Sequence, residues 1–156
     1  MSAVRAGEEA DVAAVTRLLG RAPASGFQVS VRCPRGGPAV IRNAARDARG
    51  EPFPTRQWLC CRALVQAVSR LEAAGGVRAL EDDSAMRTAL ADAQARHAAL
   101  HAGHAVAGAG DPARVKCLHA HLAFDLADGD GRVAEWILRR AGAEWPADRC
   151  CAEADG

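Results

Sequence analysis

The sequence predicts an α+β fold with an N-terminal helix, a small antiparallel sheet of about three strands, and a C-terminal bundle of about four helices. Between residues 26 and 61, short apolar stretches with alternating polarity are separated by Gly and Pro, a pattern typical of strands and turns. From residue 62 onward, apolar residues recur at intervals of three and four, which indicates helices. Strands followed by helices favour an α+β architecture over an alternating one.

Residues 8–21 predict the N-terminal helix. Val12, Val15 and Leu18 fall on one helical face. Acidic residues come early in this segment and Arg residues come late, as the helix dipole favours. We expect the helix to end near Gly20.

Three short strands are expected, over residues 26–33, 39–43 and 56–60. Alternating apolar residues in the first segment are typical of a half-buried strand. The intervening "RGGP" predicts a turn, so the first two strands should form a hairpin. Two prolines flank Phe53 in the loop that follows, and they exclude a helix or a central strand there.

The helical part follows directly. We expect one helix from residue 62 to Gly75-Gly76, a long Ala-rich helix over 84–105, a helix from Asp111 to about Gly129, and a last helix over 133–142. Asp111 is a favourable N-cap, and Pro112 is well placed in the first turn. The chain is most simply one domain over 1–156, made of a helix-plus-sheet part (1–61), a helical part (62–145) and a tail (146–156) that could be mobile.

Composition disfavours two classes of partner. The 156 residues carry a net charge of +1, and no segment gathers the Arg residues into a basic stripe, so nucleic-acid binding is not expected. No stretch approaches the roughly 20 apolar residues that span a bilayer. The acidic opening does not resemble a signal peptide. We therefore expect a cytoplasmic protein that does not bind membranes.

Six cysteines stand at positions 33, 60, 61, 117, 150 and 151, and none forms a Cys-x-x-Cys pair. In a cytoplasmic protein they are expected to be reduced thiols or metal ligands. The spacing gives no support to a zinc ribbon or finger, which brings its ligands from short knuckles. Ligands gathered from distant segments remain possible.

The stretch "RVKCLHAH" (114–121) is the densest chemical cluster and contains Lys116, the sole Lys of the chain. An amine can lose its proton when buried, whereas guanidinium cannot. On a regular helix, Cys117 and His119 point about half a turn apart and cannot bind one ion together, whereas Cys117 and His121 could. The alternative is a buried thiol that packs as a small apolar group.

Two other patterns could indicate metal sites, but both favour a structural role for their residues. His97, His101 and His104 have a spacing that could bind a metal, but no acidic residue shares their stripe, which favours packing. The segment "DLADGDGRVAEW" resembles a calcium loop only superficially. It places Leu126 and Ile137 where the first and last carboxylate ligands are required.

Several motifs occur in one order along nearly the whole chain. They are Arg32-Cys33-x-x-Gly36-x-Pro38, Pro52-Phe53-Pro54-Thr55, Trp58-Leu59, Cys61 with Leu64, Ser69-x-x-Glu72, and Lys116-Cys117-Leu118-His119-Ala120. Together they resemble an uncharacterised bacterial family, domain of unknown function 501, for which no reaction is assigned. The chain departs from the family pattern at Cys60, usually Thr, at Arg62, usually Pro, and in "DGDG", which replaces an Asn-Pro turn.

The resemblance implies a ligand set. Cys33, Cys61 and Cys117 fall on motif positions, and Cys150 or Cys151 would match a further cysteine in the tail of the family. Four thiolates suit a tetrahedral zinc ion or an iron–sulfur cluster, and His119 or His121 could replace one of them. Arg32, Glu72, Lys116 and His119 would then line the adjoining pocket and bind or act on its ligand.

Three hypotheses follow. The first is a small protein that binds zinc or an iron–sulfur cluster through Cys33, Cys61, Cys117 and a fourth ligand, which is Cys150, Cys151 or His119. The second is a metal-free enzyme with Cys117 as nucleophile, activated by Lys116 or His119. The third is a non-catalytic interaction module that uses the Ala-rich helix. The partner would be an unidentified small molecule or protein.

Overall fold

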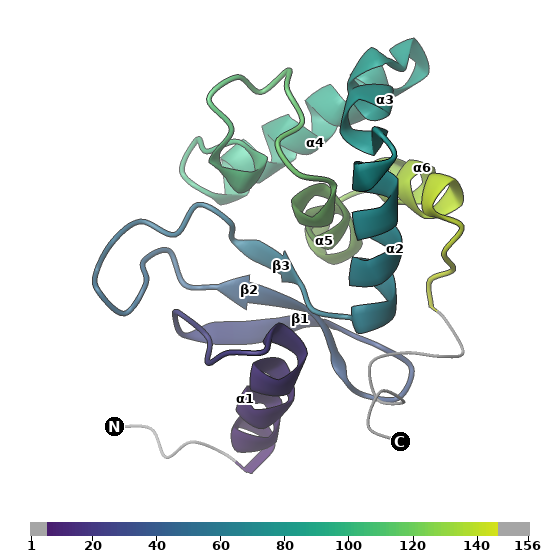
Figure 1. The fold of residues 1–156 in the computed structure, drawn as a ribbon. Helices are drawn as coiled ribbons and strands as arrows, with labels where there is room; N and C mark the ends of the chain where they lie inside the picture. Colours follow the sequence, from purple (N-terminus) through teal and green to yellow (C-terminus); the bar gives the residue numbers. More distant parts are fainter. Residues whose placement is uncertain (1–5, 147–156) are drawn as a thin grey trace.

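The computed structural model describes residues 6–146 and has the α+β architecture expected from the sequence (Figure 1). Its elements in order are α1 (Ala6–Leu19), β1 (Phe27–Arg32), β2 (Pro38–Asn43), β3 (Gln57–Leu59), α2 (Arg62–Ala73), α3 (Gly76–Asp82), the short helix η1 (Ser84–Met86), α4 (Arg87–Leu100), the short helix η2 (Val106–Gly108), α5 (Leu118–Asp128) and α6 (Arg132–Ala141). Figure 1 shows α1 on one face of the sheet and the remaining helices on the other. No helix in the described range is both long and apolar enough to cross a membrane.

The three strands form one antiparallel sheet in the order β1-β2-β3. Successive side chains of a strand point to opposite faces of the sheet, so each face packs against a different set of helices. Ile41 packs with Val15 of α1, whereas Val40 and Leu59 pack in the main core below the other helices. The expected hairpin is confirmed.

Helix α5 occupies the centre of the helical layer, against β3 and α6. Leu118 and Leu122 are fully buried in the main core, and Phe124 is buried in a second cluster with Val106. Of the first eight residues of the helix, 118–125, seven are buried and His119 is half-buried. The helix is therefore covered on most sides, and it buries the polar His121 and Asp125 together with its apolar residues.

The helix predicted from Asp111 begins instead at Leu118, so that prediction was wrong. The Asp111 carboxylate accepts a hydrogen bond from the Ala113 amide (2.9 Å) and closes a local turn rather than a long helix. The amides of Val115 and Leu118 donate to Glu81 and Glu72 on other helices. These contacts across the fold hold the intervening chain extended.

Two further helix boundaries differ from the prediction. The long helix expected over 84–105 is divided, with α4 ending at Leu100 and a turn through Ala102 and Gly103, both at positive φ. After α2, the chain resumes as α3, which was not expected. Gly75 adopts the left-handed conformation (φ 90°) that ends one helix and starts the next.

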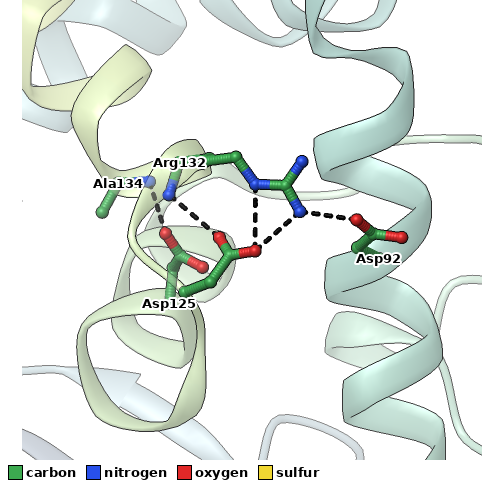
Figure 2. A network of polar contacts seen from close by, with 5 residues as sticks. Asp92, Asp125, Arg132 and Ala134 are labelled. Atoms are coloured by element: carbon green, nitrogen blue, oxygen red, sulfur yellow. Dashed lines mark hydrogen bonds and ion pairs between the residues drawn. The ribbon is translucent and has the colours of Figure 1, made fainter.

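The turn between α5 and α6 is held by carboxylates (Figure 2). Buried Asp125 accepts a hydrogen bond from the Ala134 amide (2.7 Å) in the first turn of α6. Asp130 accepts one from the Arg132 amide (3.1 Å), and the Arg132 guanidinium pairs with Asp130 and with Asp92 of α4. Asp125 and Asp130 thus accept the amide hydrogen bonds for which Gly131 has no side-chain acceptor.

Candidate functional site

A pocket of about 470 Å³ opens where the end of the sheet meets the helical layer. This volume lies in the range of small-molecule sites. Its walls come from the loop before β3, from β3, from α2 and η2, and from the start of α5. The lining residues are Pro54, Thr55, Gln57, Trp58, Leu59, Val65, Ala107, Lys116, Cys117, His119 and Ala120.

Glu72, Cys117 and His119 come together beside this pocket, and Cys117 and His119 also line it. The Glu72 Oε1 atom lies 2.9 Å from His119 Nδ1, and Cys117 Sγ lies 3.8 Å from the same nitrogen. One ligand atom from each residue lies within 4.8 Å of the other two. All three side chains are partly buried, so the group is accessible yet sheltered.

The backbone before α5 explains why Cys117 and His119 meet. Cys117 is extended (φ −157°, ψ 125°), because the helix starts only at the next residue. The separation of half a turn that holds within a regular helix therefore does not apply to this pair. The prediction that the two side chains point apart was wrong for this reason.

Glu72 fixes the relative position of α2 and α5, which lie side by side (Figure 1). Its Oε2 accepts a hydrogen bond from the Leu118 amide (2.8 Å), an unsatisfied donor at the start of α5. Cys117, at the N-cap position, provides no side-chain cap. The carboxylate thus caps one helix from another while its second oxygen faces His119.

The other ring nitrogen of His119 faces α2. Nε2 lies 3.1 Å from Ser69 Oγ and 3.3 Å from the Val65 carbonyl oxygen. When Nε2 carries the proton, it donates to this carbonyl, and the Nδ1 lone pair faces Cys117 and Glu72. Metal-binding histidines are typically oriented by such a hydrogen bond from the second nitrogen.

The charges around His119 favour its protonated form in the absence of a metal. The hydrogen bond with Cys117 raises the pKa of His119 above its ordinary value, burial opposes the rise, and the Glu72 carboxylate adds to it. A proton and a metal ion compete for the same lone pair. The Glu72 carboxylate, which attracts the proton, would also attract a cation.

Lys116 lies at the rim of the same pocket. Its side chain is exposed and lines the pocket, and its Nζ donates to the Ala107 carbonyl oxygen (3.2 Å) in η2. Lys116 therefore lines the same pocket as Cys117 and His119, with its ammonium bonded to η2.

The structure brings some of the predicted site residues together and separates others. Glu72, Lys116, Cys117 and His119 share the site. Cys33 and Cys61 are buried in the main core cluster, Arg32 pairs with Asp11 (2.7 Å) at the sheet, and His121 is buried near His97. Cys150 lies outside the described residues, so the set of four thiolates stays a prediction.

Sequence reasoning did not foresee how the group is assembled. Ser69 and Glu72 are three residues apart on one face of α2, and this spacing could have indicated that they act together. The proximity of Cys117 and His119 had no such signal, because it depends on where α5 begins. The pocket walls from Ala107 and Trp58 likewise depend on tertiary packing.

A comparison with protein families supports the resemblance noted from the motifs. The model of a family described as protein of unknown function (DUF501) matches residues 29–107, which is just over half of the chain. The match includes Cys33, Cys61 and Glu72 but stops before Lys116, Cys117 and His119. No curated protein and no solved structure matches. The chain belongs to the DUF501 family, whose function is unknown.

Proposed function

We propose that the protein binds a zinc ion through Glu72, Cys117 and His119, and that the ion acts on a small molecule held in the adjoining pocket. The observation that carries this proposal is the approach of three different donor atoms to within 4.8 Å of one another beside a pocket of about 470 Å³. Thiolate, imidazole and carboxylate are all common ligands of zinc.

The donor set favours zinc over an iron–sulfur cluster. Such clusters are held mainly by cysteine thiolates, and within residues 6–146 the group contains a single cysteine, Cys117. The second-nitrogen contact of His119 with the Val65 carbonyl is also what a zinc-binding imidazole requires.

Three protein ligands leave a coordination position open, as in catalytic zinc sites. Cys117 and His119 both line the pocket, so a molecule bound there would approach this position. A zinc ion in such a position polarises a carbonyl group or lowers the pKa of a bound water molecule. The role of the chain is then to hold the ion and to orient the bound molecule.

Metal analysis of the purified protein tests the proposal. The wild-type protein, prepared without chelators and without oxygen, should contain one zinc ion per chain. Cys117→Ser and His119→Gln should each weaken zinc binding by more than the roughly 10- to 100-fold loss caused by removing a second-shell partner.

Two matched variants serve as controls. Cys60→Ser changes a buried thiol that packs against α1, and His104→Gln changes an exposed imidazole. Both should keep one zinc ion per chain. Wild-type protein without stoichiometric zinc, or variants of Cys117 and His119 with full zinc content, would contradict the proposal.

A second candidate function is supported by the place of Cys117 at the start of α5. Its Sγ lies 3.8 Å from His119 Nδ1, within reach of a base, and a helix N-terminus favours negative charge. A metal-free enzyme of this kind should react rapidly with iodoacetamide at Cys117 near neutral pH, and His119→Gln should slow the reaction. An unreactive Cys117 in the folded, zinc-free protein would remove this candidate.

A further inference from the structure

The pocket beside the proposed zinc site is mostly apolar. Pro54, Trp58, Leu59, Val65 and Ala120 contribute its apolar walls. The Trp58 ring is fixed by neighbours on other segments, with the Phe53 ring centroid at 6.2 Å and the Arg21 guanidinium 5.8 Å from its centroid. A ligand with an apolar body would bury surface against these walls.

Within the described part of the chain, the pocket wall contains a basic side chain and no acidic one. The described lining residues include no Asp or Glu, and Lys116 supplies an ammonium group. Its ammonium carries three N–H donors, and the Ala107 carbonyl uses one of them. Two donors remain for a ligand in the pocket.

The sum of charges limits the ligand further, and this step rests on the proposed zinc site. A divalent ion together with the Glu72 carboxylate and the Cys117 thiolate has no net charge. The Lys116 ammonium then leaves one positive charge at the pocket. A single negative charge complements this pocket better than the two charges of a phosphate monoester.

We propose that the pocket binds monocarboxylates with an apolar body, and that the carboxylate contacts the Lys116 ammonium. The apolar part lies between Pro54, Trp58 and Val65. Lys116 acts here as a specificity-determining residue, because it distinguishes an acid from a neutral molecule of the same shape. Its place as the sole Lys of the chain fits this separate role.

Calorimetric titration with defined probes tests this inference. The acids are 4-phenylbutyrate and octanoate, the neutral analogue is 4-phenylbutan-1-ol, and phenyl phosphate serves as the dianion. The wild-type protein with measured zinc content should bind at least one acid more tightly than the alcohol and phenyl phosphate. Lys116→Met should weaken binding of that acid at least about fivefold, as expected when a charge-assisted hydrogen bond is lost.

Two comparisons separate the role of Lys116 from a general effect on folding. Lys116→Arg keeps the positive charge and should retain most of the affinity for the acid. Lys116→Met should bind the alcohol as the wild type does. If no acid binds, or if Lys116→Met binds the acids as tightly as the wild type, the inference is overturned.

The zinc content of the same samples distinguishes the two proposals. Stoichiometric zinc without an acid-selective pocket would overturn the pocket inference and leave the zinc site standing. Acid binding that depends on Lys116 in protein that holds no zinc would overturn the zinc site and support the pocket alone.

Discussion

Glu72 is the residue on which both the fold and the candidate site depend. One carboxylate oxygen caps α5 through the Leu118 amide, and the other faces His119. A buried amide that loses its acceptor costs about 1–3 kcal/mol. The two oxygens therefore serve separate roles that substitutions can distinguish.

We predict different consequences for two substitutions of Glu72. Glu72→Gln keeps an oxygen for the Leu118 amide, so the zinc-free protein should lose less than about 1 kcal/mol of stability, while zinc binding weakens sharply. Glu72→Ala removes both contacts and should cost about 1–3 kcal/mol in addition to zinc binding. Urea unfolding of the zinc-free proteins measures the difference, and equal stability of the two variants would contradict the capping role.

A second set of polar side chains is buried between α4, α5 and the sheet. The His97 ring centroid lies 4.6 Å from that of His101 and 4.9 Å from that of Phe124. His97 Nδ1 lies 2.7 Å from the His104 carbonyl oxygen. Both ring nitrogens of His101 lack a hydrogen-bond partner in the described structure. Neutral imidazole is the form that such surroundings tolerate.

These surroundings predict a loss of stability in mild acid. Burial lowers the pKa of His101 to about 4, with His97, Arg56 and Arg42 contributing to the fall and Asp128 opposing it. Because the folded pKa lies below the unfolded value of about 6.5, the neutral ring stabilises the fold above pH 6.5 and this contribution is lost as the pH falls toward 4.

Urea unfolding at pH 7 and pH 5 measures this effect. The stability of the wild type should fall by on the order of 1 kcal/mol more than that of His101→Phe, which cannot gain a proton. His104→Gln, at an exposed position, should behave as the wild type does. An unchanged pH dependence in His101→Phe would show that this imidazole does not titrate with unfolding.

At the scale of elements, the turn from α5 to α6 requires Gly129. A Cβ atom at this position would collide with the Asp125 carboxylate, which caps α6. We predict that Gly129→Ala destabilises the protein by about 1–3 kcal/mol, the usual cost of overpacking.

Gly110→Ala is the matched control, because a Cβ atom there meets no atom within 4 Å and its φ is not positive. The control should change stability by less than about 0.5 kcal/mol. Thermal unfolding of the two variants measures the difference. A Gly129→Ala protein as stable as the control would contradict the role assigned to this close contact.

The elements also show which parts of the fold could be predicted from sequence. The alternation of residues 27–32 and the turn before Pro38 are local signals, and they predicted the hairpin correctly. The start of α5, in contrast, is not determined by the sequence around it. The amides of Val115 and Leu118 bond to carboxylates on α3 and α2, and these distant partners outweigh the favourable helix start at Asp111.

For the whole molecule, the candidate site also has features that the sequence predicts and features that depend on contacts between distant segments. Of the residues that the motifs singled out, Glu72, Cys117 and His119 lie close together, and Lys116 lines the same pocket as Cys117 and His119. Sequence could not predict that Cys33 and Cys61 are buried in the main core cluster. A thiol is small and apolar enough to serve as core, so residue type alone does not separate a ligand from a packed side chain.

The proposed ion would join the two helices that carry its ligands. Glu72 lies in the last part of α2, whereas Cys117 and His119 lie at the start of α5. Occupation of the site would therefore stabilise the contact between α2 and α5 as well as supply chemistry at the pocket, since any ligand that binds only the folded chain stabilises it.

The absorption spectrum of the protein with cobalt(II) in place of zinc tests the central claim most directly. A cobalt ion bound by Cys117 gives a sulfur-to-cobalt charge-transfer band together with the visible bands of a four-coordinate ion. We predict both for the wild type and for Cys60→Ser. Cys117→Ser should lose the charge-transfer band. A wild-type spectrum equal to that of cobalt in buffer, or a charge-transfer band that persists in Cys117→Ser, would contradict the proposed site.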